Sequence, residues 1–112
     1  VSDLYGQKLM LMKRGWSKYT DLLRDDLWEH HPQIQIVDFS FYNLDAFNQC
    51  EHENALLMAV PQWEHVHPLL KILPVEWKHE IPFGLLYSHT PSKTVKTFVK
   101  TVAKVMRLDT AV

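Results

Sequence analysis

Residues 9–39 have the sequence LMLMKRGWSKYTDLLRDDLWEHHPQIQIVDF, and this stretch decides the fold class. The apolar run 9–12 and the β-branched, partly alternating segment 34–39 are both typical of strands. Between them, apolar residues recur at helical spacing after Ser17, a favoured N-cap, and Pro32 ends the helix. The residues expected to face the core are Tyr19, Leu22, Leu23, Leu27 and Trp28, and those expected to face outward are Asp21, Arg24, Asp25, Asp26 and Glu29.

The rest of the chain continues the alternation of strand and helix signals. In order, the predicted pieces are a short helix over 43–50 capped by Asn43, a buried strand over 55–60 stopped by Pro61, a short amphipathic piece over 62–70, an extended segment over 71–75 and a last strand over 82–88. Ser92 then caps the clearest helix, whose apolar stripe is Val95, Phe98, Val99, Val102, Val105 and Met106 and whose opposite face is Lys93, Lys96, Lys100 and Lys104. This alternation predicts an α/β fold with a mainly parallel sheet flanked by helices.

Composition limits the classes of protein to which the chain can belong. Its 112 residues suffice for one small domain, and its net charge of −1 gives the chain no overall attraction for nucleic acid. The single cysteine, Cys50, excludes an intrachain disulfide and fits the reducing cytoplasm. No apolar run approaches about 18 residues, so we expect no membrane span. The start, Val1-Ser2-Asp3-Leu4, resembles neither an initiator methionine nor a signal peptide, and we expect a piece of a longer protein.

A binding site is expected where the predicted parallel strands end, because ligands of such sheets lie outside the carboxyl ends of the strands. Lys13 and Arg14 follow the first strand and suit an anionic effector such as a carboxylate. Gly15 would let backbone amides approach that anion, and Ser17 begins a helix whose N-terminus favours anions. A solvated turn is the alternative interpretation. The candidate effector-binding residues are Lys13, Arg14, Gly15, Trp16, Ser17, Phe41 and Tyr42, of which the last two fit the core equally well.

Metal binding and catalysis are not expected from the pattern. His65 and His67, with Glu64, are spaced so that they face apart on a helix, and no Cys or HExxH motif supports them or His52 as metal ligands. Cys50 is expected to be a buried small residue rather than a redox-active thiol, since no resolving cysteine exists. No paired carboxylates or nucleophile motif indicate an enzyme. We therefore expect no metal, no cofactor and no enzymatic activity.

A series of weak motifs covers almost the whole chain. They are LYG at 4–6, the helix and following strand over 21–38, PVEW at 74–77, IPFGLLYS at 81–88 and PS at 91–92. Their order resembles the C-terminal effector-binding region of LysR-type transcriptional regulators, a family of bacterial proteins. The resemblance implies a lobe with the type II periplasmic-binding-protein fold, in which an effector lies in a cleft between two lobes.

The resemblance also implies a domain organisation and a function. Residues 1–82 would be the second lobe, and residues 83–112 would be a return hinge strand and a C-terminal helix that packs on a first lobe outside this sequence. The parent protein would be a cytoplasmic homo-oligomer that binds DNA through an N-terminal winged helix-turn-helix, also outside this sequence, under control of a small-molecule effector. Without its first lobe, the chain is expected to dimerise through the apolar stripe of the last helix, or to fold this helix back on itself differently. A lobe of a two-lobed solute-binding protein or enzyme is the alternative.

Overall fold

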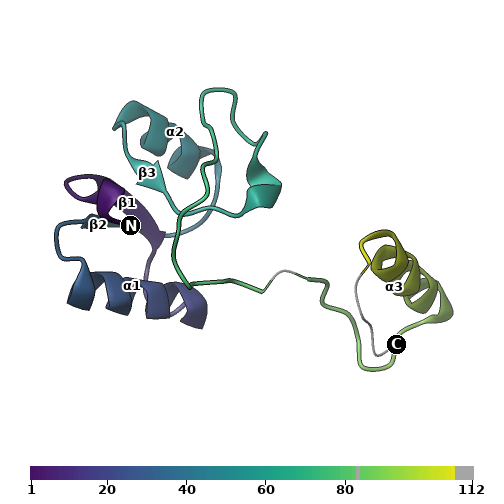
Figure 1. Ribbon diagram of the computed structural model, residues 1–112. Helices are drawn as coiled ribbons and strands as arrows, with labels where there is room; N and C mark the ends of the chain where they lie inside the picture. Colours follow the sequence, from purple (N-terminus) through teal and green to yellow (C-terminus); the bar gives the residue numbers. More distant parts are fainter. Residues whose placement is uncertain (83, 108–112) are drawn as a thin grey trace. The chain divides into compact units, whose positions relative to one another are not determined.

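The structure is a computed structural model that describes residues 1–82 and 84–107. The chain divides into two units, Val1–Ile81 and Pro82–Val112. The elements of the first unit are the 3-10 helix η1 (Ser2–Leu4), β1 (Lys8–Met12), α1 (Lys18–His30), β2 (Gln35–Phe39), α2 (Leu44–His52), β3 (Leu56–Leu57) and the 3-10 helix η2 (Pro61–Trp63). The second unit contains α3 (Lys93–Val105). These elements are labelled in Figure 1 where there is room.

A parallel sheet forms the centre of the first unit. Within the described residues its strand order is β2-β1-β3. β1 pairs with β2 along its full length, from Lys8 opposite Gln35 to Met12 opposite Phe39. Its other edge pairs with β3 in the same direction. Figure 1 shows α1 on one side of this sheet and α2 on the other. The prediction of an α/β fold with a parallel sheet is confirmed.

β1 is buried on both of its faces, which explains why it is apolar at every position from 9 to 12. Alternate residues of a strand point to opposite faces. Leu9 and Leu11 therefore pack with residues of α1, whereas Met10 packs with residues of α2, and Cys50 belongs to this second cluster. The thiol of Cys50 donates to the Ala55 carbonyl at 3.2 Å. The expectation that Cys50 is a buried small residue is confirmed.

Side-chain caps begin all of the α-helices named above, because a hydroxyl or amide oxygen accepts one of the backbone N–H groups that the first turn leaves without a partner. The pairs of acceptor side chain and donor N–H are Ser17 with Thr20, Asn43 with Ala46, and Ser92 with Val95. These capping predictions are confirmed. α1 also ends at His30, two residues before Pro32, as expected.

The buried face of α1 differs from the predicted one. Leu23 and Leu27 are buried as expected, together with Thr20, which forms the third position of a narrow stripe. Leu22 is 59% exposed and Trp28 is 78% exposed. Both lie about 100° or more around the helix from Leu23, and a sheet of few strands covers only the side directly beneath the helix. Tyr19 is likewise exposed.

The strands predicted after β2 are either shorter in the structure or absent from its described residues. β3 comprises only Leu56–Leu57 rather than 55–60, although the Met58 N–H still donates to the Met10 carbonyl at 3.1 Å. The predicted final strand is wrong for residues 82 and 84–88, because a strand needs a neighbouring strand to satisfy its backbone groups and the described part of this unit offers none. Position 83 and the tail 108–112, which was expected to fray, lie outside the described residues.

α3 exposes much of its apolar stripe. Val99 and Ala103 are buried, whereas Phe98 is 61% exposed. Val105 and Met106 are also exposed, as are the apolar side chains of the segment that precedes the helix, Leu85, Leu86 and Tyr87. The described stretches 1–82 and 84–107 contain no helix with the length and apolar character needed to cross a membrane.

Candidate functional site

The strand order locates a candidate site at one edge of the sheet. The chain leaves β1 to form β2 on one side of it and later forms β3 on its other side. Ligands of parallel sheets bind outside the carboxyl ends of the strands, near the point where the connections diverge in this way. The loop that follows β1, residues 13–17, therefore lies at the favoured edge, and the residues that follow β2 lie beside it.

Two donors of this loop are engaged by carboxylates of α1. The guanidinium of Arg14 donates to Asp25 Oδ1 at 2.5 Å, and both side chains are more than half exposed. The backbone N–H of Gly15 donates to the carboxylate of Asp21 at 3.2 Å. Gly15 has a φ of +103°, a conformation that favours glycine. The loop thus has the anion-binding donors that the sequence predicted, and acidic groups of the same chain occupy them.

The ion pair between Arg14 and Asp25 shifts the pKa values of both groups. The hydrogen bond and the attraction of the Asp25 carboxylate raise the pKa of Arg14. The same hydrogen bond lowers the pKa of Asp25, against the opposing effect of desolvation. Because both groups are open to solvent, the pair contributes little to folding stability. Its main effect is to neutralise the positive charge of Arg14 on the loop 13–17.

An exposed aromatic pair lies next to these charges. The rings of Trp16 and Phe41 lie 5.0 Å apart between centroids, at an interplanar angle of 60°. About half of each residue is exposed, 54% for Trp16 and 52% for Phe41. The ammonium group of Lys13 lies 5.8 Å from the Trp16 ring centroid, within the range of a cation–π interaction. The loops after β1 and β2 thereby bring three of the predicted residues together.

Tyr42, by contrast, turns into the protein. Its ring packs edge-on against Phe39 at 4.8 Å and against Trp63 at 4.5 Å between centroids. Its hydroxyl donates to the Met58 carbonyl at 2.6 Å, and burial raises its pKa to about 12. Of the two interpretations that the sequence left open for Phe41 and Tyr42, the exposed site fits Phe41 and the core fits Tyr42. Tyr42 thus joins the end of β2 to the end of β3.

Arg24 is a site residue that sequence reasoning missed, since it was expected to face outward. Its side chain is only 12% exposed and reaches back to the carboxyl end of β1. There it donates to Asp38 Oδ1 at 2.6 Å and to the Met12 carbonyl at 2.8 Å. Its buried Nε has no hydrogen-bond partner among the described residues. The available signal was its position, four residues after Thr20 and three before Leu27, beside the buried stripe.

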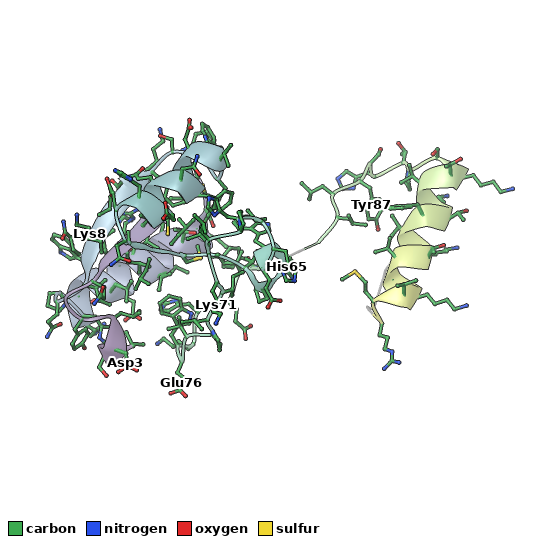
Figure 2. All side chains as sticks on the ribbon, turned by 90° about the horizontal axis from the view of Figure 1, so that it is seen from above. Asp3, Lys8, His65, Lys71, Glu76 and Tyr87 are labelled. Atoms are coloured by element: carbon green, nitrogen blue, oxygen red, sulfur yellow. The ribbon has the colours of Figure 1, made fainter. Side chains whose placement is uncertain are left out.

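Several histidines make hydrogen bonds within the first unit. His79 Nε2 lies 2.7 Å from Asp26 Oδ2, and His30 Nδ1 lies 2.8 Å from the other oxygen of the same carboxylate. Hydrogen bonds with His79 and then with His30 lower the pKa of Asp26. Within residues 1–82 and 84–107, no group of three His, Cys, Asp or Glu side chains is arranged to hold a metal ion. His65 lies on the exposed segment after η2, labelled in Figure 2.

A shallow hollow lies in the unit Pro82–Val112. It is lined by residues 87–91, which include the Tyr87 labelled in Figure 2, and by Lys96 and Lys100 of α3. It is wide open, and its lining combines hydroxyls with two flexible lysine side chains. It lacks the convergent, buried polar groups that characterise a ligand site. The edge formed by Lys13, Trp16 and Phe41 is therefore the stronger candidate.

Comparisons of the chain with protein-family models, with curated proteins and with solved structures found no match. The chemistry of the site thus has to be inferred from its own groups. It combines a lysine, an arginine already paired with a carboxylate, and two half-exposed aromatic rings. Such groups can bind a small anion that has an apolar part, through charge and stacking. Among the described residues, the groups of this site include no nucleophile that is hydrogen-bonded to a general base.

Proposed function

We propose that the chain is the second lobe of the effector-binding region of a LysR-type transcriptional regulator, with the type II periplasmic-binding-protein fold. The order of motifs from LYG at 4–6 to PS at 91–92 suggests this family. The parallel order β2-β1-β3, with helices on both faces, is compatible with the first half of such a lobe. In this proposal the lobe is a cytoplasmic sensor and not an enzyme.

The observation that carries the proposal is the exposed cationic and aromatic patch of Lys13, Trp16 and Phe41 at the carboxyl edge of the sheet. This edge is where a sensing lobe would bind its effector, and the patch suits a small anion. Arg14 and Gly15 belong to the same loop, and Ser17 fixes its end by capping α1. The patch is open on its solvent side, as expected of half a pocket that a first lobe would close.

The proposal also gives the second unit a role in the intact regulator. The apolar side chains that α3 exposes, Phe98, Val105 and Met106, would pack on the first lobe of the parent protein. Full burial of one such side chain stabilises by roughly 1.5–3 kcal/mol, so their exposure favours either this contact or self-association. Residues 84–88 form no strand in the described structure, and in the intact regulator they would become the return strand only by pairing with a neighbour that lies outside this sequence. The intact regulator would be a homo-oligomer.

The gene upstream of the codon for Val1 gives the most direct test of the proposed family. We expect an open reading frame that continues upstream, in frame, through a first lobe and a winged helix-turn-helix. A secretory signal upstream would contradict the proposal and would favour a solute-binding protein instead. A catalytic domain upstream would favour an enzyme of the same two-lobed architecture.

A further inference from the structure

The cations at the carboxyl edge differ in whether they are already neutralised. Arg14 is paired with Asp25, and Arg24 is paired with Asp38. No described carboxylate forms an ion pair with Lys13, whose ammonium group instead lies against the ring of Trp16. Of these three cations, Lys13 is therefore the one best able to bind an added anion.

Acidic groups also make this edge unfavourable for a second negative charge. Three carboxylates, from Asp21, Asp25 and Asp38, lie among the three cations, so the formal charge of the cluster is zero. A ligand with one negative charge can pair with Lys13 without displacing any of these carboxylates. A dianion needs a second cation, and the exposed guanidinium of Arg14 is the other cation of the loop. The Arg14 guanidinium has to be released from Asp25 before it can pair with the dianion.

The shape of the patch favours a flat ligand. Trp16 and Phe41 are half exposed, and a planar group can stack on an aromatic face that water otherwise covers. A carboxylate attached to that planar group would lie beside Lys13, whose ammonium group already lies over the Trp16 ring.

We propose that this edge binds a monocarboxylate that carries a planar group, and that Asp25 selects against dianions by keeping Arg14 paired. This inference rests on the proposed binding of an anionic effector and adds the class of ligand and a specificity-determining residue. Lys13 supplies the charge contact, Trp16 and Phe41 supply the apolar surface, and Asp25 acts only through Arg14. Asp25 is thus a positioning residue that does not itself contact the ligand.

The test compares phenylacetate with phenylmalonate, which has a second carboxylate on the carbon that links the first one to the ring, and with the neutral phenylacetamide. Dissociation constants are measured at pH 8 by NMR titration of the 112-residue chain, because this method detects weak binding. We expect the chain to bind phenylacetate more tightly than either of the others. Asp25→Asn should improve the affinity for phenylmalonate relative to phenylacetate by about three- to fivefold, the value of an exposed ion pair.

The matched control is Glu29→Gln, which removes the same charge from the exposed face of α1 one turn further along. It should leave the ratio of the two affinities unchanged, and Lys13→Ala should weaken the binding of both acids. An unchanged ratio in Asp25→Asn, an equal change in Glu29→Gln, or no binding of phenylacetate would each overturn the inference. The regulator proposal is tested separately by the upstream coding sequence, so the two can fail independently.

Discussion

Two leucines of α1 that the sequence pattern treats alike should differ sharply in their contribution to stability. Leu22 and Leu27 both fit the predicted apolar stripe, yet Leu22 is 59% exposed and Leu27 is 1% exposed. Leu27 packs in the cluster that includes Leu9 and Leu11 of β1. Substitution of each leucine by alanine changes helix propensity by the same small amount, so the difference between the two variants reports burial alone.

The size of the difference follows from burial. Removal of a buried leucine side chain costs the transfer free energy of the lost atoms together with the cost of the cavity that remains, about 3–5 kcal/mol for Leu27→Ala. Substitution of an exposed side chain changes stability by no more than roughly 0.5 kcal/mol, which is our expectation for Leu22→Ala. In a unit of this size each 1 kcal/mol lowers Tm by about 4–8 °C.

Urea unfolding followed by far-ultraviolet circular dichroism would measure both variants against the parent chain. We expect the midpoint to fall strongly for Leu27→Ala and to stay near that of the parent for Leu22→Ala, with unchanged slopes. If Leu27→Ala loses too much structure for a fit, Leu27→Met, which conserves volume, should retain a measurable transition with a loss below about 1.5 kcal/mol. Equal losses for the two alanine variants would refute the packing of α1 described above.

Three further predictions concern single groups of the first unit. Tyr42→Phe leaves the Met58 carbonyl without its donor and should cost about 1–2 kcal/mol in urea unfolding, whereas no measurable loss would contradict the 2.6 Å hydrogen bond. Burial raises the pKa of the Cys50 thiol, so iodoacetamide at pH 8 should label it slowly in the native chain and quickly in urea; equal rates would show that it is accessible. The hydrogen bond with His79 lowers the pKa of Asp26 below its ordinary 3.8, so this carboxylate stabilises the fold above that pH and loses the effect as the pH falls through its folded value. Asp26→Asn should therefore flatten the decline of stability below about pH 4, and an unchanged acid limb in thermal melts would count against the contact.

Local signals predicted the helices well. An N-cap needs only one side-chain oxygen and a backbone N–H two or three residues later, so Ser17, Asn43 and Ser92 could be identified without knowledge of the tertiary structure. The central strand was also evident, because a run such as 9–12 that is apolar on both faces fits a parallel strand covered by helices on both sides.

Features that depend on a neighbour could not be predicted in the same way. The segments 55–60 and 82–88 both have strand-like composition, but a strand exists only where another strand offers hydrogen bonds. β1 pairs on its second edge with Leu56–Leu57 and accepts one further hydrogen bond from Met58, and residues 84–88 have no neighbouring strand in the described part of their unit. The composition of a segment indicates a preference for the strand conformation but does not determine whether a second strand pairs with it.

Prediction of the candidate site from the sequence was limited for the same reason. The loop 13–17 was predicted because the alternation of strands and helices and the composition of the loop are visible in the sequence. Arg24 was missed, because a long side chain can keep its stem on apolar surface and carry its charge to a distant strand end. Phe41 and Tyr42 are adjacent and similar in composition, and only the packing of Tyr42 against Trp63 distinguishes their roles.

NMR titration of the isotope-labelled chain with a set of small carboxylates tests the binding of an anionic effector at the carboxyl edge most directly. We predict that the first resonances to shift are the backbone amide of Gly15 and the indole N–H of Trp16, and that Lys13→Ala weakens the binding that these shifts report. Shifts confined to the hollow lined by residues 87–91, or no shift at either place, would contradict a binding site at this edge.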